Sequence, residues 1–391
     1  IGKCMLESGA AERIVRSILK IFGLKNTPIA LIITSFFIGI PVFFDAVIFM
    51  MFPIAKSLTI RTGKNYLLAI LCIIAGTAMA TSLVPPNPGP VFLAGALQIP
   101  LGIMIIGGII VGLCTLVPGY FWAKWANGKW QVPLRDSLDA RLDDIKKASE
   151  KDERMLPSLF ISLLPVVIPI LFIVTSTFLQ NFSHPGSGVS KSGLLDVLGG
   201  IILFLGEKNV ALITGGVAGI LILARQFKGD REGRLGKSVS SALTSGGNIV
   251  LIICAGGAFG AMLQQTGISQ VIGEMTKGYQ MALIPLAFLV TAAIRTAQGS
   301  ATVALITSSG ILSGLTTSGV QLEYNPMYLA LAIGCGSKLI AWMNDSGFWV
   351  VTKMSNLTEK EALQSYSPML AVMGVTGLLV ILLGAKILPL V

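Results

Sequence analysis

Long apolar runs recur along the whole chain, and several of them are interrupted by prolines, glycines or charged residues. A run of about 20 apolar residues has the length of a helix that crosses the hydrocarbon core of a membrane. The pattern therefore predicts membrane-spanning helices, some of them broken. The expected segments lie at about 28–55, 66–84, 91–122, 156–180, 209–224, 246–265, 281–312, 327–343 and 368–390.

Two further segments suit a membrane surface better than its interior. Residues 1–27 predict an amphipathic helix, with isoleucines on one side and basic residues on the other. Residues 194–206 are too short to cross, and we expect them at the interface. Because the chain begins with Ile1 and has no signal-peptide pattern, we interpret it as trimmed at its N-terminus.

Composition agrees with a membrane-embedded chain. Hydrophobic residues make up 53% and charged residues 12%, and the mean hydropathy is +0.79. An ordinary soluble domain has about 25% charged residues. The net charge of +10 comes mostly from short loops, so it does not indicate a nucleic-acid partner. By the positive-inside rule, the basic segments 123–155 and 225–245 are predicted to be cytoplasmic and 181–208 to lie outside.

Catalytic and metal-binding chemistry is poorly represented. His184 is the only histidine, and it falls in a polar loop. The cysteines show no CxxC spacing, so we interpret them as small buried apolar residues. We therefore expect neither an enzyme nor a cofactor, and the coupling ion is expected to be a proton, with sodium left open.

The two ends of the chain resemble each other weakly. An offset of about 258 residues places the break at Gly39–Asp45 on Thr296–Thr302, and the proline-rich break at Pro85–Pro90 on Asn344–Phe348. Broken apolar segments at matching places in two halves are typical of transporters whose site lies between inverted repeats. Few positions are identical, so chance similarity is the alternative. The predicted division is a first transmembrane repeat over 1–122, a cytoplasmic amphipathic linker over 123–155, a connecting transmembrane pair over 156–245 and a second transmembrane repeat over 246–391.

Polar groups at membrane depth are costly unless they face a cavity or a partner, and the first two breaks carry such groups. Pro41 breaks a helix beside Asp45, which predicts a proton or cation site; the alternative is a helix cap or a structural pair. The run Pro85–Pro90 is not expected to be helical. It predicts a re-entrant tip that presents Asn87 and Gly89 to substrate, or else a turn outside the membrane.

The third break surrounds Arg295, the only arginine inside an apolar run. A guanidinium can bind a carboxylate through two hydrogen bonds. The neighbouring Gln298, Ser300 and Thr302 suit a hydroxylated ligand. The alternative is that Arg295 pairs with an aspartate of the first or fourth break and holds the helices together.

The fourth break combines Asn344, Asp345 and Ser346 with a following glycine. We predict that Asn344 and Ser346 bind substrate and that Asp45 or Asp345 carries the coupling proton. Nearby Lys338 is interpreted as a side chain that merely snorkels to the membrane surface.

At these breaks the sequence resembles the gluconate:proton symporter (gluconate permease) family of the ion transporter superfamily. The resemblance implies an all-α polytopic membrane fold with two inverted-topology repeats, broken helices and re-entrant hairpins. It also implies uptake of gluconate or related sugar acids with protons across a bacterial inner membrane; some relatives take D-serine or other small hydroxy acids. The matching strings, in family order, are Ser8–Ile14, Gly39–Phe44, Pro85-Pro86 with Pro88–Pro90, Gly256–Gly260, Ala297–Ala304 and Asn344–Trp349.

The chain departs from the family pattern at several polar positions. The family often has Glu where Asp45 stands, and often has His at Thr81, Asn87 and Trp342. Histidine is the side chain that titrates near neutral pH. The departures therefore leave the carboxylates as proton carriers and leave the particular substrate open. The family is also longer at its start.

The resulting hypothesis is secondary active uptake of gluconate or a related sugar acid, coupled to protons. The alternative is a symporter for D-serine or another small hydroxy or dicarboxylic acid, with sodium as a second candidate ion. A membrane-embedded enzyme would need a nucleophile–base pair or a metal set within the bilayer, which His184 alone in a polar loop does not supply. A passive channel fits the repeat and the broken helices less well. The expected partners are a small anionic hydroxy acid and the lipid bilayer, with a homodimer as an assembly to test and no nucleic acid.

Overall fold

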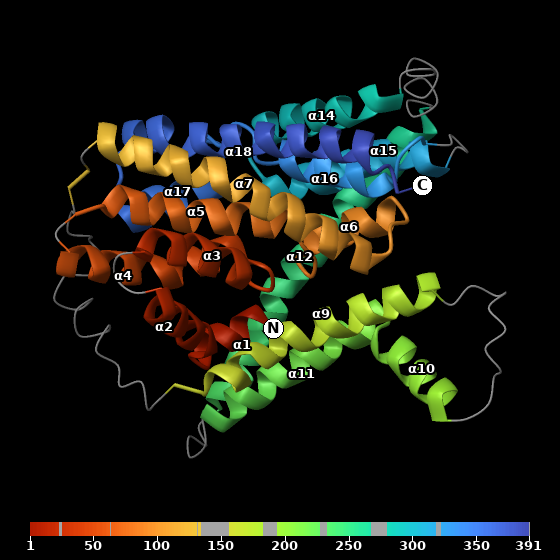
Figure 1. The fold of residues 1–391 in the computed structure, drawn as a ribbon, viewed down its shortest axis with the longest axis horizontal. Helices are drawn as coiled ribbons and strands as arrows, with labels where there is room; N and C mark the ends of the chain where they lie inside the picture. The colour runs from red at the N-terminus through yellow and green to blue at the C-terminus, as the bar shows by residue number, and fades with distance from the viewer. Residues whose placement is uncertain are drawn as a thin grey trace.

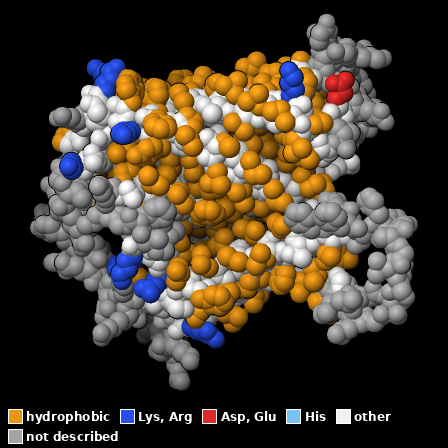
Figure 2. All heavy atoms as spheres, viewed as in Figure 1, with side chains coloured by type: hydrophobic (Ala, Val, Ile, Leu, Met, Phe, Trp, Pro, Cys, Tyr) orange, Lys and Arg blue, Asp and Glu red, His pale blue; other side chains and the backbone are white. Residues whose placement is uncertain are grey.

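The computed structural model describes residues 1–22, 26–62, 64–130, 132–133, 156–182, 194–226, 233–266, 280–317 and 322–390. All regular structure in these residues is helical (Figure 1). Five stretches of the described chain are long and apolar enough to cross a membrane. Hydrophobic side chains cover the middle of the face in Figure 2, with lysines and arginines at its margins. The protein is a multi-pass integral membrane protein, as the apolar runs predict.

The described residues up to Trp130 form seven helices. They are α1 (Gly2–Glu7), α2 (Ala10–Phe22), α3 (Thr27–Gly39), α4 (Phe44–Thr62), α5 (Tyr66–Leu83), α6 (Pro88–Ala96) and α7 (Leu101–Lys129).

The middle of the chain connects two halves. It contains α9 (Leu159–Phe182), α10 (Leu194–Leu205), α11 (Lys208–Gln226) and α12 (Arg234–Gln265). The predicted boundary at 245 falls inside α12, whose first turns occupy part of the predicted cytoplasmic loop 225–245. Most of the predicted linker 123–155, and His184, lie outside the described residues.

The last part begins with a short 3-10 helix at Gln280–Ala282. It continues with α14 (Leu283–Gln298), α15 (Ala301–Thr317), α16 (Pro326–Gly336), α17 (Ser346–Ser355) and α18 (Glu359–Ile387). The apolar run predicted at 281–312 is thus two helices that separate at Gly299-Ser300, and the run at 327–343 is helical only to Gly336.

The boundary predicted at residue 122 falls inside α7, which continues to Lys129. An aromatic and basic cluster explains this longer helix. The Lys129 Nζ lies 4.8 Å from the ring centre of Trp125 and 5.2 Å from that of Trp130. Tryptophan and lysine are typical of the interface between membrane and water, so this end of α7 carries the side chains expected at a membrane surface.

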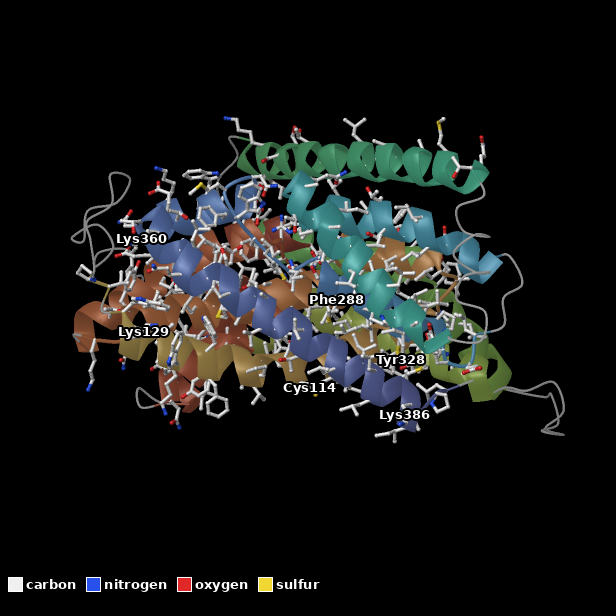
Figure 3. The ribbon with its side chains drawn as sticks, turned by 90° about the horizontal axis from the view of Figure 1, so that it is seen from above. Cys114, Lys129, Phe288, Tyr328, Lys360 and Lys386 are labelled. Atoms are coloured by element: carbon white, nitrogen blue, oxygen red, sulfur yellow. The ribbon has the colours of Figure 1, made fainter. Side chains whose placement is uncertain are left out.

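The helices α3 to α7 form one set and α14 to α18 a second set (Figure 1). In each set, one break separates the first two helices and another separates the third helix from the fourth. The last helices of the two sets, α7 and α18, pack side by side in opposite directions. Gly119 lies against Met373, whereas Thr115, earlier in α7, lies against Gly377, later in α18. Figure 3 shows Lys129 on the same side of the molecule as Lys360, with Lys386 on the opposite side. The inverted repeat stays a prediction that agrees with this order and direction.

Helices of one set also pack against helices of the other set. α4 packs against α17, and α15 packs against α6. Each of these helices begins directly after a break. The packing between the sets therefore brings together the breaks α3–α4, α5–α6, α14–α15 and α16–α17. This placement positions the candidate site.

Candidate substrate and ion site

A cavity of about 970 Å³ lies where the four breaks meet. This volume falls within the range of about 300–1,000 Å³ that is usual for small-molecule sites. The polar residues that line it come from both sets of helices. They are Asp45, Thr81, Ser82, Asn87, Arg295, Ser300, Thr302, Lys338, Asp345, Ser346 and Tyr366, and the backbone of Gly89 joins them.

The break between α3 and α4 presents Asp45 in the first turn of α4. The side chain is exposed and lines the cavity. Within the described part of the chain, its carboxylate neither accepts a hydrogen bond nor forms an ion pair. The structure therefore gives no support to the alternative that Asp45 is a helix cap or a structural partner of Arg295.

The break between α5 and α6 is shorter than predicted. Pro88 is the first residue of α6, so the second half of the run Pro85–Pro90 is helical, contrary to the prediction. The physical reason is that the first turn of a helix leaves its N–H groups without intrahelical partners, so prolines are tolerated there. The turn before it lies inside the protein beside the cavity and is not an outside loop.

Asn87 joins this turn to the end of α3. Its Nδ2 donates hydrogen bonds to the carbonyl oxygens of Gly39 at 2.7 Å and Ile40 at 2.6 Å. These carbonyls belong to a helix end, where four oxygens have no intrahelical donor. The side chain of Asn87 is 5% exposed, so the two bonds satisfy groups that water cannot reach easily.

Arg295 donates three hydrogen bonds at the site. Its Nη2 donates to Asp345 in a buried ion pair, its Nη1 to the carbonyl of Gly299, and its Nε to the carbonyl of Ser337 at 3.0 Å. Arg295 is 2% and Asp345 6% exposed. The sequence left open whether Arg295 binds substrate or pairs with an aspartate. In the structure it forms an ion pair with Asp345.

Asp345 also caps the N-terminus of α17, because its Oδ1 accepts a hydrogen bond from the Gly347 backbone N–H at 2.8 Å. The other oxygen of the carboxylate is the one that Arg295 contacts. Asp345 therefore fixes the start of α17 relative to the end of α14.

Asn344 plays the part at the end of α14 that Asn87 plays at the end of α3. Its Nδ2 donates to the carbonyls of Thr296 at 2.7 Å and Ala297 at 3.3 Å. In both cases the acceptors lie 48 and 47 residues before the asparagine. A matched pair of contacts at the same spacing supports the internal repeat independently of sequence identity.

Two predicted substrate residues lie outside the lining of the cavity. Asn344 is committed to the carbonyls at the end of α14. Gln298 is exposed as the last residue of α14, and the chain then turns at Gly299, whose φ is +83°. The other predicted residues all line the cavity, namely Asp45, Asn87, Gly89, Arg295, Ser300, Thr302, Asp345 and Ser346.

The sequence interpretation missed Lys338, Ser82 and Tyr366 as cavity residues. Lys338 is 6% exposed, so it does not snorkel to a membrane surface. The sequence did contain a sign that Lys338 faces a cavity, because this lysine, like Arg295, is a cation within an apolar run. Ser82 and Tyr366 gave no such signal, since hydroxyl groups are common in membrane helices.

Removing the Asn87 contacts should destabilise the protein. We expect Asn87→Leu to lower the free energy of unfolding by about 1–2 kcal/mol, because two carbonyls lose their donor in a buried place. The isosteric Asn87→Asp should cost more, because a carboxylate would face two carbonyl oxygens. The thermal unfolding midpoint of the purified protein measures both; an Asp variant as stable as wild type would contradict the assigned donor.

Gly299 is required by its conformation and by its neighbour. A Cβ there would overlap the Asn344 carbonyl, and the positive φ disfavours any other residue. We expect Gly299→Ala to destabilise by about 1–3 kcal/mol. The matched control is Gly95→Ala, since a Cβ at this helical position meets nothing within 4 Å. Equal melting temperatures for the two variants would contradict the expected clash.

Broken membrane helices whose breaks meet at a cavity with a polar lining are typical of membrane transporters. Comparison with known proteins gives the family. The family model described as GntP family permease matches residues 1–387, and the chain belongs to this family.

Relatives agree over almost the whole chain. A protein named gluconate permease from Pseudomonas aeruginosa is 32% identical over 99% of this chain and 83% of its own length. The low-affinity gluconate transporter of Escherichia coli K12 is 28% identical, with the same coverage of both chains. The inner membrane permease YgbN of Escherichia coli K12 is 31% identical over 97% of this chain and 82% of its own.

A solved structure supports the fold. The YdaH transporter of Alcanivorax borkumensis, described as having an unusual topology, superposes with a TM-score of 0.62. The match covers 100% of this chain and 85% of that one, at 15% identity. At this identity the likeness shows the fold alone.

Proposed function

We propose that this permease takes up gluconate or a closely related sugar acid together with protons, across a bacterial inner membrane. The observation that carries the proposal is the cavity, which gathers acids, bases and hydroxyl groups from four helix breaks in one space. The relatives named as gluconate carriers support the ligand class, and the name of YgbN supports the inner membrane.

The lining suits an anion with several hydroxyl groups. Ser300, Thr302 and Ser346 offer hydroxyls at the starts of α15 and α17, and Ser82 adds another from α5. Helix N-termini carry a partial positive charge and unpaired N–H groups, which favour a carboxylate. A polyhydroxylated monocarboxylate could therefore satisfy its hydroxyls and its charge in the same cavity.

We assign the coupling proton to Asp45. Asp345 is held by Arg295 and by the Gly347 N–H, so its role is to fix the geometry of the two breaks. Asp45 faces the cavity without such contacts among the described residues. A proton on Asp45 removes a negative charge that would repel an anionic substrate, and this repulsion links the two bindings.

The test is uptake of labelled gluconate into proteoliposomes. We expect accumulation under an inward proton gradient, abolished by a protonophore and inhibited by excess unlabelled gluconate. A sodium gradient is imposed in parallel. Accumulation with sodium alone would contradict proton coupling, and no uptake of gluconate under either gradient would contradict the substrate.

A further inference from the structure

Lys338 is a buried cation whose charge the contacts described so far do not use. It follows the end of α16 in the break before α17, is 6% exposed, and lines the cavity. Over the part of the chain that the structure describes, its Nζ has neither a hydrogen-bond acceptor nor an ion-pair partner. Lys338 differs in this from Arg295, whose guanidinium is occupied on three sides.

The charged groups around Lys338 divide into two kinds. Arg295 and Asp345 neutralise each other in their buried pair. Asp45, in contrast, lines the cavity and has no ion-pair partner among the described residues. The remaining titratable side chain that lines the cavity is Tyr366, which is buried on α18. Among the described side chains that line the cavity, Lys338 and Asp45 are therefore the two charged ones without an ion-pair partner.

We propose that the Lys338 ammonium binds the carboxylate of the substrate, while Arg295 serves to hold Asp345. This inference rests on the proposed function and deepens it. In the empty cavity Asp45 is the counter-charge of Lys338. In the loaded cavity the substrate carboxylate takes over that role, and one proton on Asp45 keeps the sum of charges unchanged.

The charge balance also selects the substrate class. One monocarboxylate and one proton leave the cavity as neutral as it was when empty. A dicarboxylate would bring a second negative charge, and among the described residues no further cationic side chain without an ion-pair partner lines the cavity. Charge uncompensated in a low-dielectric site is costly, so hydroxy monocarboxylates are the expected ligands.

The experiment compares each of two carboxylates with its uncharged amide. Binding of gluconate, gluconamide, glycerate and glyceramide to the purified full chain is measured for wild type, Lys338→Met and Lys338→Arg. Wild type should bind each carboxylate more tightly than its amide, on the order of ten-fold, as expected of a charge-assisted contact. Lys338→Met should remove most of this preference for the carboxylate, and Lys338→Arg should keep most of it.

The ratio of affinities separates a direct contact from a structural role. A variant that merely distorts the cavity weakens acid and amide together, and an unchanged ratio in Lys338→Met would overturn the proposal. If wild type binds glycerate but not gluconate, the proposed substrate fails, and the glycerate ratio still tests Lys338. If wild type binds no carboxylate, both fail.

Discussion

Replacing Arg295 by Met should abolish transport and destabilise the protein by about 3–5 kcal/mol. The reason is that Asp345 would keep its charge in a buried place without its counter-ion. The carbonyls of Gly299 and Ser337 would lose a donor at the same time. The measurements are the thermal midpoint and the monodispersity of the purified variant, together with uptake in proteoliposomes.

A double variant separates charge from packing. We expect Arg295→Met with Asp345→Asn to regain most of the lost stability, because no unpaired charge remains, while transport stays absent. An Asp345→Asn single variant should lie between the two. If Arg295→Met alone is as stable as wild type, the ion pair does not hold the breaks together, and Arg295 becomes available to substrate.

Replacing Asp45 by Asn should remove accumulation and leave exchange. Without a group to carry the proton, a proton gradient no longer drives gluconate inward, and the internal concentration should not exceed the external one. Exchange of labelled for unlabelled gluconate should continue, because the neutral amide resembles the protonated carboxyl. Uptake with and without the gradient, and counterflow in the same vesicles, measure the two processes.

Controls for Asp45 come from the same cavity. Asp45→Glu keeps the titrating group and should retain accumulation in part. Asp345→Asn should lose both accumulation and exchange, since it removes the partner of Arg295. Undiminished proton-driven accumulation in Asp45→Asn would disprove its role as proton carrier.

Much of the architecture follows from the sequence because proline, glycine and charge inside apolar runs interrupt helices wherever they occur. The breaks beside Asp45 and at Gly299 were predicted at these places, and the break predicted at Pro85–Pro90 ends at Asn87. The fourth break was predicted at Asn344–Phe348, whereas the structure has it at 337–345, because Asp345 caps α17 and the helix begins at Ser346. Eight of the ten predicted site residues line the cavity for the same reason, since each belongs to a break.

The contacts of the individual site residues could not be predicted, because they depend on how the helices pack and not on the local sequence pattern. The sequence could not decide between Asp45 and Asp345 as partner of Arg295, because that choice is made by the distance between α14 and the start of α17. Gln298 and Asn344 have suitable chemistry, yet the turn at Gly299 and the carbonyls of α14 take them out of the cavity. Lys338 was misjudged because a lysine's long stem suits a surface as well as an interior.

The length of α7 and α18 has a consequence for the surrounding bilayer. Each helix has 29 residues, which at 1.5 Å per residue is about 43 Å, whereas the hydrocarbon core is about 30 Å thick. Because the two are packed antiparallel, hydrophobic mismatch acts on them as one unit, and they must tilt or protrude together. Membrane thickness therefore acts on the conformation of the protein. A thinner bilayer increases the tilt of this pair and changes the orientation of α6 and α17, which precede α7 and α18 in the chain.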